Sequence, residues 1–112
     1  MKMNKIVSLY VAFVGKEGGK RRPVLVVENS ENEIIFYSIT SKYQNKSEKI
    51  KKLYFKINDW KDSNLKKESW IDIGTLFILS KDKTDFEYKD IGELSQNDTD
   101  RLEVFLKNTL KR

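Results

Sequence analysis

Apolar and aromatic residues occur along this chain in short runs of strand length, separated by polar or glycine-containing segments. Runs rich in β-branched and aromatic residues are typical of β-strands. They predict strands at residues 6–14, 22–28, 34–40, 53–57 and 69–79. Gly74 could bend the last run and start a sixth strand beyond it, because a missing side chain permits a bulge. Residues 43–52 have no consistent period and are predicted to form an exposed loop.

The last part of the chain has the period of an α-helix. Ser95 and Asp98 give the Ser-x-x-acid pattern, in which the first side chain accepts a backbone N–H and the acid favours the positive end of the helix. An apolar stripe follows at helical spacing and is expected to pack on the sheet: Leu102, Phe105, Leu106 and Leu110.

A shorter helical turn is expected between the fourth and fifth predicted strands. Asn58 or Asp59 could cap this turn, which would end at Asn64 with Trp60 and Leu65 packed beneath it. With 112 residues the chain can build one domain, residues 1–112, and not two. Together these elements predict a mainly β (α+β) fold, a small and strongly curved antiparallel sheet closed by one C-terminal helix.

The second predicted strand begins with an unusual combination of residues. Residues 15–19 hold three of the five glycines, and residues 20–22 are Lys-Arg-Arg. Pro23 suits the first residue of a strand, because its φ is fixed and it lacks a donor. Residues 24–27 are an unbroken apolar run, which indicates a strand covered on both faces. The two arginines therefore lie where a flexible loop meets the core, a good position for holding a phosphate.

Positive charge is concentrated in the middle of the chain. The net charge is +5, and residues 42–67 carry nine lysines against three acidic residues. Such a block favours a polyanion partner, although a solvated lysine-rich loop is the alternative interpretation. Interleaved aromatic residues support nucleic acid, because bases stack on aromatic faces: Tyr43, Tyr54, Phe55 and Trp60.

Composition also limits the compartment. No apolar run reaches the length of a transmembrane helix. Lys2 and Lys5 before the apolar residues 6–14 could belong to a signal peptide, but no convincing cleavage site follows, so we interpret the run as a strand. The absence of cysteine excludes disulfides and fits a reducing cytoplasm.

The available chemistry is narrow because the chain has neither histidine nor cysteine. Imidazole catalysis, Ser-His triads and the usual zinc sites are excluded. Asp82, Asp85, Glu87 and Asp90 lack calcium-loop spacing, so we expect no metal or other cofactor. Metal-free phosphate chemistry remains possible on RNA, which carries its own nucleophile in the 2′-hydroxyl. Arginine stabilises a developing phosphate charge well through paired donors that stay charged.

Several motifs in order along the chain resemble the MazF/PemK/Kid family of toxin ribonucleases. The glycine-rich loop leads into Lys-Arg-Arg-Pro-Val-Leu-Val-Val at residues 20–27, and Ser-Ile-Thr-Ser-Lys follows at residues 38–42. The similarity continues through residues 59–60, 69–71 and 91–95. This resemblance implies a compact SH3-like barrel that forms a homodimer. It also implies metal-independent cleavage of single-stranded RNA through the 2′-hydroxyl, and neutralisation by an acidic antitoxin with which the toxin binds DNA.

The resemblance also assigns roles to individual residues. Arg22 would stabilise the phosphate and the transition state, and Thr40 would donate its hydroxyl to the scissile phosphate. On the fifth strand, where relatives have an arginine and then an acid, we align Asp72 and Gly74. Asp72 could replace the lost acid as a general base. The remaining candidates would bind RNA: Lys16, Gly18, Gly19, Lys20, Arg21, Ser41 and Lys42.

A purely structural interpretation stays open for each of the three proposed catalytic residues. Arg22 could be a surface arginine, Thr40 an ordinary strand threonine, and Asp72 a structural partner of an arginine. The pair of a glycine and an acidic residue that is common before the first strand of the family is replaced here by Asn4 and Lys5. A non-catalytic barrel of the same build, which binds RNA or a protein as the CcdB-like gyrase poisons do, is therefore the second candidate function.

Overall fold

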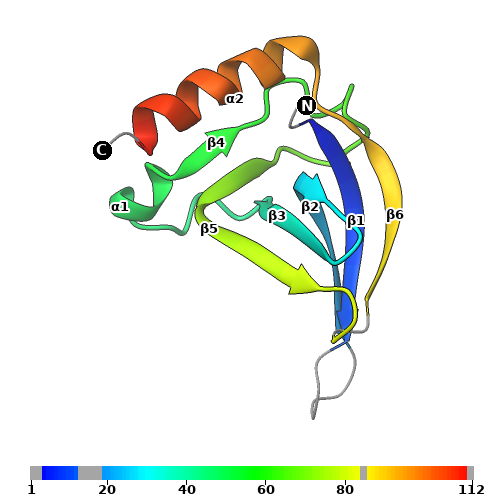
Figure 1. The fold of residues 1–112 in the computed structure, drawn as a ribbon. Coiled ribbons are helices and arrows are strands. Elements are labelled where there is room, and N and C mark those ends of the chain that lie inside the picture. Colours follow the sequence, from blue (N-terminus) through cyan, green and yellow to red (C-terminus); the bar gives the residue numbers. More distant parts are fainter. Residues whose placement is uncertain (1–3, 13–18, 84–85, 111–112) are drawn as a thin grey trace.

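The computed structural model describes residues 4–12, 19–83 and 86–110. Its elements, in chain order, are β1 (Lys5–Ala12), β2 (Gly19–Asn29), β3 (Glu33–Thr40), α1 (Glu48–Lys51), β4 (Tyr54–Lys56), β5 (Trp70–Ser80), β6 (Phe86–Glu93) and α2 (Gln96–Thr109). Figure 1 shows a strongly curved sheet with α2 lying across one end of it. The predicted mainly β fold with one long C-terminal helix is confirmed.

The sheet is antiparallel throughout, and its strand order is β4-β5-β3-β2-β1-β6. β4 and β6 lie at the two ends of this order and do not pair with each other. The sheet is therefore not closed into the expected SH3-like barrel. β4, with three residues, is too short to close it. α2 instead runs over the open side, from the end of β6 toward β4 (Figure 1).

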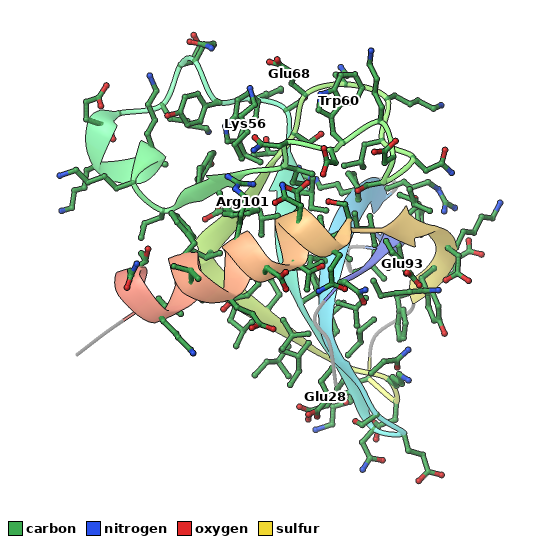
Figure 2. All side chains as sticks on the ribbon, turned by 90° about the horizontal axis from the view of Figure 1, so that it is seen from above. Glu28, Lys56, Trp60, Glu68, Glu93 and Arg101 are labelled. Carbon is green, nitrogen blue, oxygen red and sulfur yellow. The ribbon has the colours of Figure 1, made fainter. Side chains whose placement is uncertain are left out.

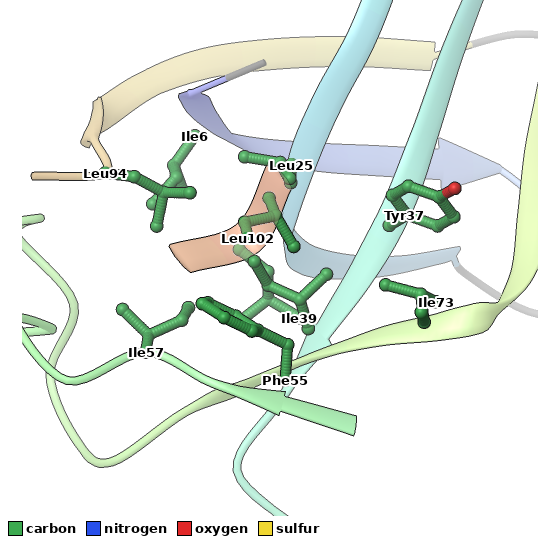
Figure 3. Close-up of a cluster of buried hydrophobic side chains, with 10 residues drawn as sticks. Ile6, Leu25, Tyr37, Ile39, Phe55, Ile57, Ile73, Leu94 and Leu102 are labelled. Carbon is green, nitrogen blue, oxygen red and sulfur yellow. The ribbon is translucent and has the colours of Figure 1, made fainter. Parts of the chain in front are cut away.

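Apolar side chains pack on both faces of the central strands. The larger cluster lies beneath α2 and joins Leu25 of β2 to Leu102 of the helix (Figure 3). The smaller cluster contains Val24, the neighbour of Leu25, together with Ile34 and Phe36 of β3. Consecutive residues of a strand point to opposite faces. The prediction that residues 24–27 form a strand covered on both faces is thus confirmed.

The strand predictions hold for β1 to β5, apart from residues at the ends, and residues 13 and 14 lie outside the described part. The run at 69–79 forms one strand that continues through Gly74, so the suggested sixth strand was wrong, although the register does shift there. β6 was not predicted. Four of its eight residues are charged. This composition suits an edge strand, and among the described strands β6 pairs with β1 alone.

Two helical details also differ from expectation. Residues 43–52 are not all loop, since Ser47 caps the single turn of α1 by accepting the N–H of Ile50 at 3.3 Å. Leu110 does not join the apolar stripe of α2. It follows the last helical residue, Thr109, and is 50% exposed. Leu102, Phe105 and Leu106 do pack on the larger cluster.

The start of α2 is tied to the turn at residues 58–64 by a buried carboxylate. Ser95 caps α2 as predicted, accepting the N–H of Asp98 at 3.0 Å. Asp98 is fully buried and accepts the backbone N–H groups of Asn58 at 3.2 Å and Asp59 at 2.8 Å. The Arg101 guanidinium lies 2.7 Å from the same carboxylate. Asn58 and Asp59 were predicted to cap this turn with their side chains. In the structure their backbone N–H groups instead donate to the side chain of Asp98, 40 and 39 positions away.

The same turn closes at Asn64 and rests on β6. Asn64 has a φ of 68°, a conformation that asparagine tolerates. Its N–H donates to Lys61 O, and the next N–H, of Leu65, donates to Trp60 O, which is the Schellman pattern of a helix end. The Asn64 side chain donates to Ile91 O at 2.8 Å. A side chain at Gly92 would lie 2.6 Å from Ser63 O, so only glycine lets the turn approach this closely.

We predict that Asp98→Ala lowers the free energy of unfolding by about 3 kcal/mol, because it leaves two backbone donors and the Arg101 guanidinium without their acceptor. Glu103→Ala on the exposed side of the same helix should change it by no more than about 0.5 kcal/mol. Urea unfolding of both variants measures the difference. Equal stabilities would show that the carboxylate does not hold the turn.

Candidate functional site

A groove of about 1080 Å³ lies where β2, β3, β4 and β5 meet the segment at residues 64–69. It is lined by six of the residues singled out from the sequence: Arg21, Arg22, Thr40, Ser41, Lys42 and Asp72. These positions are up to 51 residues apart in the chain, and pairing of the strands brings them to one surface. The structure thus groups the predicted residues, although it does not test their roles.

The register of the sheet explains this grouping. Tyr54, Asp72, Ser38 and Val24 are successive partners across β4, β5, β3 and β2, so their side chains form one row on one face. Arg22 lies two residues before Val24, and Thr40 two residues after Ser38. Because side chains alternate with a period of two, Arg22 and Thr40 share that face and flank the row on the same side.

Arg21 and Arg22 have different surroundings. The Arg21 guanidinium lies 3.9 Å from the Glu87 carboxylate of β6 and over the Tyr10 ring of β1. Arg22 is exposed, and its guanidinium makes no ion pair or hydrogen bond with any described residue. Its donors are therefore available to a ligand, whereas Arg21 already shares its charge with a surface carboxylate.

Thr40 ends β3 with its hydroxyl held in a local turn. The Thr40 Oγ1 accepts the N–H of Lys42 at 3.0 Å. A hydroxyl that accepts one bond still has its own hydrogen to donate. Thr40 is half-buried, and Ser41 and Lys42 beside it are exposed. This geometry leaves the hydroxyl able to donate to an oxygen bound in the groove.

Asp72 lies in the middle of the row and does not pair with an arginine. Its Oδ1 accepts the N–H of Gly74 at 2.8 Å, and none of the salt bridges among the described residues includes it. The structural alternative considered above, an Asp72–arginine pair, is therefore absent from this part of the chain. Burial, and after it the negative charge of Asp72, raises the pKa of the Tyr54 hydroxyl above its ordinary value. Tyr54 thus keeps its proton at neutral pH.

Most of the aromatic residues expected to stack on bases are already covered. The Tyr43 ring stacks on Trp70 at 4.7 Å, and the Lys51 ammonium lies 4.9 Å from its centroid. Phe55 is 3% exposed in the core. Trp60 packs against the larger cluster, with the Lys61 ammonium over its ring. The stacking expectation is therefore wrong for these residues, because their faces serve the fold, and Tyr54 alone of the four lines the groove.

The basic block at 42–67 divides between the groove and the outer surface. Among the described residues, the groove is lined by Lys42, Lys46, Lys66, Lys67 and the two arginines, and by two acidic residues, Asp72 and Asp90. Lys56 instead faces Glu68 at 3.5 Å and the Trp70 ring (Figure 2). The groove is thus strongly positive, in agreement with a polyanion partner.

Some candidate residues lie outside what the structure describes, and some residues of the groove were missed. Lys16 and Gly18 fall outside the described residues. Gly19 and Lys20 begin β2, but the Lys20 side chain lies outside what the structure describes. Ser38 and Phe77 line the groove without having been predicted. The period-two pattern from Thr40 could have found Ser38, whereas Phe77 depends on an irregularity in β5.

The part of the chain that the structure describes holds no cluster of three potential metal ligands. None of its helices is long and apolar enough to cross a bilayer. A family described as PemK-like, MazF-like toxin of type II toxin-antitoxin system matches residues 5–110. No curated protein matches the chain significantly.

We predict that Asp72→Asn lowers the pKa of Tyr54, because removal of a nearby negative charge favours the tyrosinate. The pKa should remain above its ordinary value, since burial is the larger cause. Asp90→Asn, which removes the other carboxylate of the groove, should leave the Tyr54 pKa unchanged. A pH titration of the tyrosine ring signals by NMR measures all three proteins, and an unshifted Tyr54 in Asp72→Asn would contradict the coupling.

Proposed function

The chain belongs to the PemK-like, MazF-like toxins of type II toxin–antitoxin systems, and on that premise we propose that it is a cytoplasmic endoribonuclease that cuts single-stranded RNA without a metal. One observation carries the proposal. Arg22, Thr40 and Asp72, selected from the sequence on three separate strands, line a single basic groove. A guanidinium, a hydroxyl donor and a carboxylate are the groups that such a cleavage requires.

The proposed reaction uses the substrate's own nucleophile. The ribose 2′-oxygen attacks the adjacent phosphorus, and Asp72 takes the proton of the 2′-hydroxyl as general base. Arg22 stabilises the charge that develops on the phosphoryl oxygens, and the Thr40 hydroxyl donates to one of them. The bond to the 5′-oxygen breaks, and this oxygen takes a proton from water. The products are a 2′,3′-cyclic phosphate and a 5′-hydroxyl end.

The antitoxin of the system is proposed to act in the same groove. An acidic and partly disordered segment could order itself along the six basic side chains that line it. Such a segment would occlude the track of the RNA. Its attraction would weaken as salt is added, because the groove is open to solvent.

A homodimer is proposed from the resemblance and from an uncovered apolar surface. Leu76 and Ile78, on the last part of β5, are 48% and 59% exposed. Large apolar residues that remain exposed side by side mark interaction sites. A two-fold contact through this end of β5 would place two grooves near each other, since Asp72 and Phe77 of the same strand line the groove.

We predict that the wild-type protein cleaves single-stranded RNA in EDTA, and that Arg22→Ala and Thr40→Ala each lower kcat by ~10²–10³, the usual effect of losing a donor to developing charge. Lys46→Ala should mainly weaken binding and reduce its salt dependence, because this residue contributes only a charge to the groove. Gel assays of kcat and KM separate the two effects. Arg22 is exposed and unpartnered among the described residues, so thermal unfolding of Arg22→Ala should match the wild type.

Two controls decide between this mechanism and the alternatives. An RNA with one 2′-deoxy sugar at the cut site should resist cleavage, and DNA should be inert. Cutting of the deoxy substrate, or full activity of Arg22→Ala, would refute the mechanism. Failure of the wild type to cut any RNA would favour the non-catalytic binding module.

We predict a two-fold dimer in sedimentation at micromolar concentration, and its dissociation by Ile78→Asp, which places a charge in the apolar contact. Val104→Asp on α2, an apolar position that is 58% exposed, should leave the dimer intact. A monomeric wild type would refute the dimer, whereas a dimeric Ile78→Asp would locate the contact elsewhere.

A further inference from the structure

Phe77 is an exposed aromatic ring in the groove, and it is held on one side by the core. It is 40% exposed, whereas Phe36 beneath it is only 6% exposed. The two rings stack with centroids 5.3 Å apart and planes 12° from parallel. One face of Phe77 is therefore fixed by a buried ring, and its exposed surface lies on the groove that also contains Arg22 and Thr40.

An irregularity of β5 creates this position. Asp72 pairs with Ser38, and Phe77 pairs with Phe36. Between these two pairs lie four residues of β5, 73–76, and one residue of β3, Tyr37, so the β5 segment bulges out of the ladder. Bulges of this kind re-aim side chains beside functional sites. In a regular ladder Gly74 would stand opposite Phe36, and the groove would have no ring at this point.

The bulge is itself held by specific contacts. The Asp72 carboxylate accepts the N–H of Gly74, and the N–H of Ile73 donates to Leu53 O at 3.0 Å. A side chain at Gly74 would meet Leu53 Cδ1 at 3.0 Å and the Asp72 carboxylate at 3.1 Å. The ring of Phe77 is thus placed by the same carboxylate that we propose as general base.

The distance from the proposed cleavage site suits a neighbouring nucleotide. Phe36 and Thr40 are four residues apart on β3, and a strand rises roughly 3.3 Å per residue, so the two rows lie about 13 Å apart. A phosphate held between Arg22 and Thr40 would therefore leave Phe77 to a base on a flanking nucleotide. Base–aromatic stacking tolerates any base and adds affinity in a basic channel.

We propose that Phe77 is a stacking platform for a nucleobase that flanks the cleaved phosphate. This inference rests on the proposed RNA substrate and adds to it a subsite for a flat, uncharged ring. Tyr54, the other aromatic residue among the described residues of the groove, lies in the row of Asp72. A contact of Phe77 with a second copy of the chain is the competing role, and the test below separates the two.

The test compares Phe77→Leu, which keeps an apolar side chain over Phe36, with Phe77→Trp, which restores an aromatic face. The probe is a short single-stranded RNA whose 2′-deoxy sugar at the mapped cut site prevents cleavage. Phe77→Leu should raise Kd by ~10- to 100-fold, as loss of one base stack does, and Phe77→Trp should stay within about twofold of the wild type. With cleavable RNA, Phe77→Leu should raise KM and leave kcat nearly unchanged. Tyr88→Leu, an exposed aromatic of β6 that does not line the groove, should bind RNA normally.

An abasic scan of the same RNA identifies the stacked base. In the wild type, removing one base beside the cut should cost as much as Phe77→Leu, and in Phe77→Leu the same removal should cost little more. If removal of the base and Phe77→Leu each weakened binding independently, so that their effects on Kd added up, the stacking proposal would be overturned. An unchanged Kd in Phe77→Leu would also overturn it. A dimer weakened by Phe77→Leu with RNA affinity unchanged would assign the ring to the interface instead.

The outcome is separable from that of the proposed function. If the wild type binds RNA without cutting it, homopolymer RNAs replace the mapped substrate, and the comparison of Leu with Trp still decides whether the ring stacks on a base. If the wild type cuts RNA and Phe77→Leu behaves identically in Kd and KM, the nuclease stands and the platform falls. A wild type that binds no RNA would overturn both.

Discussion

The arrangement of the groove depends on one buried carboxylate, that of Asp98. Its oxygens accept two backbone N–H groups of the turn at 58–64 and face the Arg101 guanidinium. A buried charge is tolerable only when its lone pairs are satisfied, so α2 and the turn must dock together or not at all. The turn then leads directly into residues 64–69, which form one side of the groove. Packing of α2 therefore also positions Lys66 and Lys67 at the groove.

The second constraint is the bulge in β5, which makes one strand serve two purposes. At its start, Ile71 and Ile73 belong to the core under α2, while Asp72 between them faces the groove. After the bulge, Phe77 stacks on Phe36, which belongs to the smaller cluster. Ile78 is left exposed. The bulge, with four residues of β5 opposite one of β3, thus separates the acid of the groove from an aromatic ring and an apolar surface. A regular strand of the same sequence would not present these three features together.

Much of this architecture could be predicted from residue patterns, and the exceptions have physical causes. The run at 24–27, the cap at Ser95 and the stripe through Leu102 are local signals, and the structure contains each of them. β6 was missed because an edge strand buries little and so carries no clear apolar period. The aromatic residues were misjudged because composition cannot tell a ring with an open face from Tyr43, which lies between Trp70 and Lys51. Phe77 was missed because counting alternate residues fails across a bulge.

The open sheet has a further consequence for the behaviour of the chain at high concentration. An unpaired strand edge is a template for association with other chains. The N–H of Ile57 donates to Ser69 O, next to β5, and the N–H of Ile73 donates to Leu53 O, next to β4. By alternation, the backbone of Lys56 therefore points away from β5. There the Arg101 guanidinium donates to the Lys56 carbonyl oxygen at 3.3 Å. At the opposite edge, β6 alternates charged side chains such as Glu87 and Lys89 along its exposed length. The Arg101 guanidinium at β4 and the charged side chains of β6 therefore disfavour pairing of these two strands with other chains, and with it the assembly of the protein into fibres.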